Sequence, residues 1–384
     1  AVNSRFRVMT SFGGVEVDRV LFRDRRAGPT RCLVEERAQL MGGFWTTQAA
    51  KLGALAISEM PMKRAESFFA EAGTMPVSRS SLLRLAGWLS DLWEGDREAH
   101  EEKVRLATTV PENAVVVTVS LDGVMVLMTD SDKAAKKIQA KAQGYADKGP
   151  SGWREASVGV ISFYDAEGER LETRRYARMP ESNKTTTKSW LREELAHIRT
   201  SRPELVVAAI ADGAANNWTF LGELGADHEV VDFFHTAEHL HRHVNKANGA
   251  STVHTQAVLT SMRRRLMTEP GAATAIATEL QEMRERAGTQ AVSTTKSRGK
   301  RQPTYFERHH ERMDYPRLKQ ANLPIGSGVT ESTCKLLLCD RLRRTGMRWT
   351  QNGGQAVLTL RAWRISGCFD HAWKLLMEEN RDQL

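Results

Sequence analysis

Two apolar segments of the chain each end in an Asp-Gly pair, and this pairing constrains the fold more than any other feature. Residues 205–211 read LVVAAIA and precede Asp212-Gly213, while residues 114–121 read AVVVTVSL and precede Asp122-Gly123. Short apolar runs that stop at a turn signal are typical of strands buried in a sheet. We therefore expect two buried strands that each deliver one carboxylate at their end, where glycine lets the backbone turn away.

The neighbouring segments predict an α/β order around these strands. Further strands are expected at residues 124–128, 156–164 and 228–234, a helix near Lys184–Arg199, and a short helix from Asn217. The order is then three strands, a helix, a strand, a helix and a strand. Paired buried strands that each supply a carboxylate are typical of a ribonuclease H-like fold, a mixed sheet flanked by helices, and we predict that fold for the catalytic domain.

A third carboxylate is needed if the site holds metal ions for phosphodiester chemistry. Two Mg²⁺ ions, with Mn²⁺ as the alternative, can activate a nucleophile and neutralise charge on the phosphate, and such hard cations need converging carboxylates. Glu331 in GSGVTESTCKLL follows a Gly-rich turn and opens an apolar-periodic helix, and Lys335 lies one turn later, where it can meet a DNA phosphate. The plainer alternatives are an ordinary Asp-Gly turn and a glutamate placed by the helix dipole.

A histidine-rich segment, DFFHTAEHLHRH at 232–243, competes as a metal site. Asp232, His235, His239 and His243 fall along one face of a helix, and histidines four residues apart can chelate zinc. Histidines that simply lie on a helix are the plainer interpretation. We favour a third, in which His235 and Asp232 border the Mg²⁺ site just beyond the strand at 228–234 and orient a ligand or contact DNA.

The 384 residues suggest two or three domains. We expect an N-terminal domain over residues 1–105, the first catalytic part over 106–235, a basic helical insertion over 236–320 and a C-terminal helical part carrying Glu331 over 321–384. The first domain begins with a hairpin around Gly13-Gly14 and continues as helices over 46–101, where a serine before SLLRLAGWLSDLW can cap a helix. A helix-turn-helix DNA-binding module and an ordinary helical bundle both fit these helices.

Charge and composition limit the class of protein. The net charge of +8 is concentrated in residues 236–384, which carry 24 Lys and Arg against 14 Asp and Glu, and this favours a nucleic-acid partner over a merely basic protein. No apolar run approaches the roughly 20 residues that span a bilayer, and the first residues lack the apolar core of a signal peptide. The first residue is not Met, so we expect a short N-terminal piece to be missing. Four cysteines without a CxxC pair are expected to be reduced thiols of a cytoplasmic protein.

The motifs taken together resemble those of bacterial insertion-sequence transposases of the ISKra type, within the DDE transposases. They keep their order over about two-thirds of the chain; LDG alone is unspecific, whereas IADGAxxNW, PIGSGxxE and GMRW in combination are specific. The matching segments are LDGV (121–124), YARM (176–179), IADGAANNW (210–218), VDFFHTAEHL (231–240), PIGSGVTESTCK (324–335), RLRRTGMRW (341–349) and LRAW (360–363).

The resemblance implies a ribonuclease H-like domain in which Asp122, Asp212 and Glu331 form the DDE triad, with a helical insertion before the glutamate. It also implies that Asp232 and His235 match the [C/D]xxH signature of related transposases. The implied activity is metal-dependent cleavage at the ends of an insertion sequence and strand transfer to target DNA, by a bacterial, nucleoid-associated protein that acts as a homodimer on DNA. The alternatives are a structure-specific DNA endonuclease of the same fold and a non-catalytic DNA-binding protein derived from a transposase.

Basic side chains of the C-terminal part are expected to clamp the DNA backbone. Trp349 is expected to pack in the core, with base stacking as the alternative, and Trp218 to pack behind Asp212. The predicted backbone contacts are Arg263, Arg264, Arg265, Lys296, Arg298, Lys300, Arg301, Arg343, Arg344 and Arg348.

Overall fold

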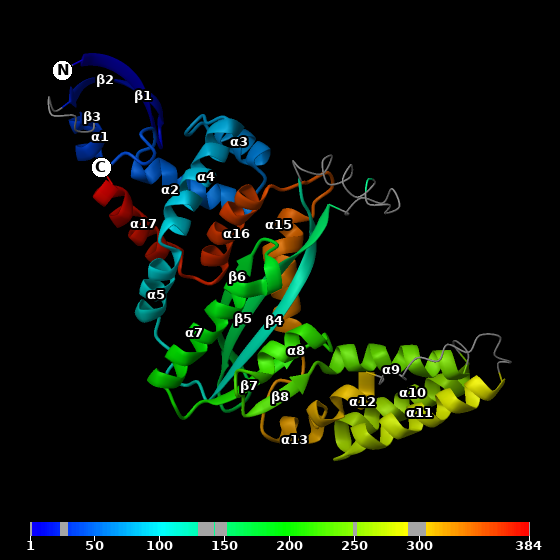
Figure 1. Ribbon diagram of the computed structural model, residues 1–384. Helices are drawn as coiled ribbons and strands as arrows, with labels where there is room; N and C mark the ends of the chain where they lie inside the picture. Colours follow the sequence, from blue (N-terminus) through cyan, green and yellow to red (C-terminus); the bar gives the residue numbers. More distant parts are fainter. Residues whose placement is uncertain are drawn as a thin grey trace.

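A mixed five-stranded sheet forms the centre of the molecule in the computed structural model (Figure 1). The structure describes residues 2–23, 30–129, 142, 152–248, 252–290 and 305–383. The strand order is β6-β5-β4-β7-β8, in which β5 runs antiparallel to both neighbours and β4, β7 and β8 run parallel to one another. The strands are β4 (Val116–Leu127), β5 (Trp153–Tyr164), β6 (Arg170–Arg178), β7 (Val206–Ala211) and β8 (His228–Val231).

The expected order of three strands, a helix, a strand, a helix and a strand is confirmed, but two of the strands were assigned wrongly. The predicted strands 114–121 and 124–128 are one strand, because β4 continues through Asp122-Gly123 while it pairs with β5. The strand β6, with the charged sequence RLETRRYAR, was not predicted; it lies at the edge of the sheet, where only alternate positions need be apolar. The last strand ends at Val231 rather than at residue 234.

Helices cover both faces of the sheet. On one face α7 (Thr185–Ser201), close to the predicted helix, packs Leu191 against Gly159 of β5, where an added Cβ atom would come within 3.2 Å of that leucine. On the other face lie α14 (Gly328–Cys334) and α16 (Gln351–Ile365), so that Val158 and Val160 of β5 share a core with Leu337 and Val357. The short helix α8 (Ala215–Gly222) follows β7. The structure is therefore α/β, with a mixed sheet flanked by helices.

The predicted insertion is helical and projects away from the sheet (Figure 1). Its long helices are α9, α10 and α11, and its core joins that of the sheet through Phe306, Met313 and Tyr315. The elements are α9 (Phe233–Asn248), α10 (Val253–Thr268), α11 (Ala272–Gln290), α12 (Tyr305–His309), the 3₁₀ turn η2 (His310–Arg312) and α13 (Tyr315–Gln320).

The N-terminal segment begins with the predicted hairpin and continues as helices. The strands β1 and β2 pair across the turn before Gly13, and the Ser78 hydroxyl caps α4 by accepting a hydrogen bond from the Ser81 amide at 3.1 Å. The elements are β1 (Val2–Thr10), β2 (Gly13–Arg23), β3 (Thr30–Cys32), α1 (Leu33–Ala38), α2 (Thr47–Glu59), α3 (Met62–Glu71), α4 (Arg79–Gly95) and α5 (Arg97–Ala107).

These helices share their core with the C-terminal helices. Leu85 and Leu89 of α4 belong to the same buried cluster as Val357 and Leu360 of α16, and the buried Arg361 donates to the Ser58 carbonyl at 2.7 Å. The described helices before residue 105 thus share a buried cluster with the C-terminal helices, and α4 packs against α16. The remaining C-terminal elements are the π-helical segment η3 (Lys335–Cys339), α15 (Asp340–Leu342) and α17 (Phe369–Gln383).

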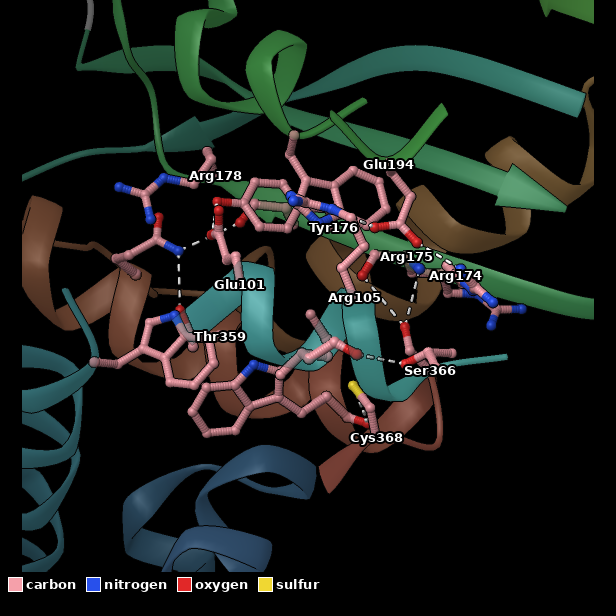
Figure 2. Close-up of a pocket in the computed structure, with 18 of the residues that line it drawn as sticks. Glu101, Arg105, Arg174, Arg175, Tyr176, Arg178, Glu194, Thr359, Ser366 and Cys368 are labelled. Carbon is pink, nitrogen blue, oxygen red and sulfur yellow. Dashed lines mark hydrogen bonds and ion pairs between the residues drawn. The ribbon is translucent and has the colours of Figure 1, made fainter. Parts of the chain in front are cut away.

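A buried polar network fastens α5 to the sheet and to α7 (Figure 2). Glu194 of α7 accepts hydrogen bonds from Arg105 of α5 at 3.2 Å and from Arg174 of β6 at 2.6 Å. Beside it, the Tyr176 hydroxyl donates to Glu101 of α5 at 2.5 Å. Each charged group has a partner, as buried charges require.

Two expectations from composition can be compared with the structure. Within the described ranges, none of the helices combines the length and the apolar character that a membrane crossing requires. All four cysteines (Cys32, Cys334, Cys339 and Cys368) are free thiols.

Candidate metal centre

The strand register places three aspartates at the same level across β4, β7 and β8. Val119 pairs with Ala209 in the parallel ladder of β4 and β7, so three residues further along Asp122 is level with Asp212. Ala211 pairs with Val231 in the next ladder, and the Asp232 amide donates to the Ala211 carbonyl at 2.9 Å, which brings Asp232 level with Asp212. Because adjacent strands lie about 4.8 Å apart, the three carboxylates share one end of the sheet.

Asp122 lies inside β4 and not at its end, which corrects the prediction of a turn at this Asp-Gly pair. A Cβ atom at position 123 would meet the side chain of Glu155, which would have to shift, and the glycine does not bend the strand. The Asp122 carboxylate accepts hydrogen bonds from the Gly123 amide at 2.7 Å and from the Cys334 thiol at 3.4 Å. Burial raises the pKa of Asp122, and the negative charge of Asp212 raises it further.

Asp212 follows β7 directly, as predicted, and its loop is held in place from two sides. Its carboxylate accepts a hydrogen bond from the Ala214 amide at 3.0 Å, and its carbonyl accepts one from the Trp218 indole at 2.6 Å. Trp218 is buried behind it, in agreement with the packing interpretation. A side chain at Gly213 would overlap the ring of Tyr305, so this glycine is required by the close approach of α12.

Asp232, His235 and Glu331 form a compact group whose ligand atoms all lie within 4.8 Å of one another, and this group could hold a metal ion. Asp232 is fully buried and accepts hydrogen bonds from the His235 amide at 2.6 Å and from the Ser327 amide. The His235 ring lies 3.1 Å from Asp232 and 3.8 Å from Glu331. The hydrogen bond to Asp232 raises the pKa of His235 to about 9, although partial burial lowers it.

Glu331 reaches this group from 119 residues beyond Asp212, on the predicted helix α14. Its carboxylate accepts a hydrogen bond from the Ser327 hydroxyl at 3.2 Å. One turn later Cys334 contacts Asp122, so α14 spans the distance between the Asp232 group and Asp122. The helix then widens into the π-helical segment η3, and Lys335 at its start is exposed. Such bulges are frequent at functional sites.

The predicted triad is gathered at one end of the sheet without closing into one cluster. Asp212 is close enough to influence the pKa of both Asp122 and His235, and Glu331 contacts His235. Among the described residues, however, the compact group of possible metal ligands is Asp232, His235 and Glu331. From the sequence, Asp232 and His235 were predicted to border the metal site; in the structure His235 lies 3.8 Å from Glu331, and Ser327 links Glu331 to Asp232.

The other histidines of the 232–243 segment do not join this group. The His239 ring stacks on Tyr305 with centroids 3.7 Å apart, and partial burial lowers the pKa of His239 to about 4. The His243 Nδ1 atom donates a hydrogen bond to the His239 carbonyl at 2.7 Å. In the part of the chain that the structure describes, the histidine-based zinc site is therefore not assembled.

Lys184 is a residue of this centre that the sequence did not single out. It stands in the connection between β6 and α7, and its amino group lies 3.0 Å from Glu155 and 3.3 Å from the Asn217 side chain. Its positive charge lowers the pKa of Asp122. Nothing in the local pattern marks Lys184, because it reaches the site through the packing of α7 on the sheet.

The predicted DNA-backbone contacts differ in their surroundings. Arg263 and Arg264 are exposed on α10, as are Arg343, Arg344 and Arg348 after α15. Arg265 is instead paired with Glu279 of α11 at 2.8 Å and with Glu269, so it links two helices of the insertion. Lys296, Arg298, Lys300 and Arg301 lie outside the described residues.

Trp349 packs at the end of β4, in agreement with the core interpretation. Its indole donates to the Leu342 carbonyl at 3.0 Å, and its backbone forms a bridge with Met128. The buried Arg341 lies over its ring. The ring is partly buried and packs against the core that α4 and α16 share.

The chain matches no protein-family model, and none of the curated proteins matches it significantly.

Proposed function

We propose that the chain is a DNA transposase with a ribonuclease H-like catalytic domain, which cuts the ends of a mobile element and joins them to target DNA. The observation that carries the proposal is the alignment of Asp122 and Asp212 on neighbouring parallel strands, at the end of the sheet where α14 brings Cys334 against Asp122 and Glu331 against His235. The motifs that resemble ISKra-type transposases contain these three residues.

The sheet supports the fold assignment. Numbered within the domain, the strand order is 3-2-1-4-5, with the second strand antiparallel to its neighbours, and this order is compatible with a ribonuclease H-like fold. The helical insertion enters after the last strand and before Glu331, as the resemblance implies. Rules on how strands are connected leave only a few topologies for a given strand order, so this order is informative about the fold.

The residues of the site fit divalent metal ions. Carboxylate oxygens are the ligands that Mg²⁺ and Mn²⁺ prefer. The pKa of Asp122 is raised by burial and by the charge of Asp212, so the surrounding protein groups do not fully compensate the negative charge of this carboxylate. Asp122, Asp212 and Glu331 would hold two ions, which in such sites supply an activated nucleophile and neutralise charge on the phosphate.

The neighbouring side chains would keep these ligands in place. The His235 Nδ1 atom lies 3.1 Å from the Asp232 carboxylate and 3.8 Å from the Glu331 carboxylate, so the ring stands between the two acidic groups. The Ser327 hydroxyl and the Ser327 amide join Glu331 to Asp232. The orientation of Glu331 therefore depends on Asp232, although Asp232 itself is turned toward backbone amides.

A cleavage assay on DNA that carries the element's ends tests the proposal. With Mg²⁺ present, Asp212→Asn should lose cleavage by a factor of at least about 100, since a metal ligand is removed with little change in shape. Asp227→Asn is the matched control; that aspartate also accepts a backbone amide hydrogen bond, but from Val207 at the opposite end of β7. Cleavage by Asp212→Asn at the wild-type rate would contradict the triad.

A nuclease that cuts without joining strands would use the same carboxylates, so cleavage alone does not separate the two activities. Supplying cut element ends together with target DNA does. Joined products are expected for a transposase, and cut ends without joined products would favour the endonuclease. Because two ends must be brought together, we further propose a homodimer on DNA, which sedimentation of the complex would detect.

A further inference from the structure

A polar groove opens beside the carboxylates, where the chain passes from β6 to α7. Its larger hollow encloses about 450 Å³ between β5, the 3₁₀ turn η1 (Ser182–Lys184), α7 and α8. A second hollow of about 240 Å³ adjoins it, and the two share Asn183, Lys188 and Asn216 in their walls. Hollows of a few hundred Å³ are the size class of sites for small ligands and nucleotides.

The groove begins at the metal centre. Asn217 in its wall donates to the Asp212 carboxylate at 3.5 Å and accepts a hydrogen bond from Lys184 at 3.3 Å. The charge of Lys184 acts on Asp122. A DNA strand with one phosphate at the carboxylates would therefore continue along the polar side chains of α7 and α8.

The backbone at the mouth of the groove is held in an unusual conformation. Asn183 and Lys184 are consecutive non-glycine residues in the left-handed region, with φ of 55° and 54°. Such residues cost free energy and persist where the surroundings hold them, which is frequent at binding sites. Here Glu155 holds the Lys184 amino group, and the Glu181 carboxylate accepts a hydrogen bond from the Thr186 amide at 2.9 Å.

Lys188 stands where the two hollows meet. Its amino group lies 2.9 Å from the Asn183 side chain and 5.6 Å from the centre of the Phe220 ring. The neighbouring cations are neutralised, Lys184 by Glu155 and Arg192 by Glu223. Among the described residues, no carboxylate lies within ion-pair distance of Lys188, so a backbone phosphate would complete its surroundings.

We propose that this groove binds a single-stranded segment of the DNA that passes through the carboxylate centre. Lys188 contacts a backbone phosphate, and the exposed amides of Asn183 and Asn216 contact the sugar or the base edges. Hollows of nucleotide size receive one strand more readily than a duplex. The inference rests on the proposed nucleic-acid function and adds to it a site for the unpaired strand.

The test is equilibrium binding of a fluorescein-labelled single-stranded oligodeoxynucleotide to the full chain in EDTA, read by anisotropy over a series of salt concentrations. Lys188→Ala should weaken binding several-fold and reduce the salt slope by about 0.7, the value for one lost phosphate contact on a single strand. Lys188→Arg should restore the slope. Lys103→Ala, at an exposed lysine of α5, is the control and should match the wild type.

A second readout locates the strand directly. Photocrosslinking of an oligonucleotide that carries iododeoxyuridine should label the peptide containing Asn183 and Lys188. An unchanged slope in Lys188→Ala, absence of the crosslink, or failure of the wild type to bind the oligonucleotide would each overturn the groove. These results do not depend on cleavage. Loss of cleavage in Asp212→Asn with normal behaviour of Lys188→Ala rejects the groove alone, whereas the reverse pattern rejects the triad alone.

Discussion

The buried carboxyl group of Glu101 should make the stability of the protein fall as the pH rises. Glu101 is 6% exposed and lies on α5 against the sheet (Figure 2). Burial raises the pKa of Glu101 to about 7, outweighing the Tyr176 hydroxyl and the ion pair with Arg97, which lower it. The folded state therefore holds the proton more tightly than the unfolded state. The stabilisation is complete below the ordinary pKa of about 4.5 and is lost as the pH rises through about 7.

The size of the effect follows from the shift. A difference of one pKa unit corresponds to about 1.4 kcal/mol, and between pH 5 and pH 8 most of the proton affinity difference of Glu101 is expressed. The expected loss of unfolding free energy over this interval is about 2 to 3 kcal/mol. Two histidines also contribute to the pH dependence of stability. His235 stabilises the folded state more at the lower pH, because its pKa is raised, whereas His239, whose pKa is lowered, stabilises it more at the higher pH.

A comparison with Glu101→Gln isolates the contribution of Glu101 from these histidines. Urea unfolding of both proteins at pH 5 and pH 8 gives four free energies, and the wild type should lose about 2 to 3 kcal/mol more than the variant between the two pH values. Glu98→Gln, at an exposed position of the same helix, should behave as the wild type does. Equal pH dependence in Glu101→Gln and the wild type would refute the reasoning from burial.

Two further predictions concern packing around the sheet. Gly213→Ala should destabilise the protein by about 1 to 3 kcal/mol in urea unfolding, because the new methyl group overlaps the Tyr305 ring. The control Gly87→Ala, in open space on α4, should stabilise the protein by about 0.5 to 1 kcal/mol. Equal effects of the two substitutions would contradict the close approach of Tyr305 to Gly213. Glu194→Gln should cost about 3 kcal/mol in the same measurement, because Arg105 and Arg174 lose their shared buried partner. The neighbouring Glu193→Gln, half-exposed beside Arg105, should cost less than about 1 kcal/mol, and a similar cost for both variants would argue against the buried network.

The sequence predicted the order of elements better than it predicted the elements themselves. It divided β4 at Asp122-Gly123, because Asp-Gly is the usual signal of a turn, and it overlooked β6, because RLETRRYAR carries five charged residues in nine. The two errors compensated each other in the count. Both arise from the same cause: a strand is stabilised by its pairing partners, and β5, which pairs with β4 and with β6, overrides the local preferences of both.

In the candidate site, too, some features follow from the local sequence and others depend on tertiary packing. Asp212 was predictable because an apolar run delivers it at the end of a strand, and Glu331 because a Gly-rich turn precedes its helix. The contact of Glu331 with His235 was not predictable, because it depends on how α14 returns to the sheet after the insertion.

The alignment of Asp232 with the other two aspartates follows from the strand pairing and can be worked out only when the ladders are known. Asp232 comes directly after β8, as Asp212 comes directly after β7, and the pairing of Ala211 with Val231 makes them level. In the β4–β7 ladder Val119 pairs with Ala209, so Asp122 is level with Asp212, although β4 continues past Asp122. A shift of one residue in either register would turn a carboxylate to the opposite face of the sheet. The site therefore depends on two ladders as much as on its five side chains.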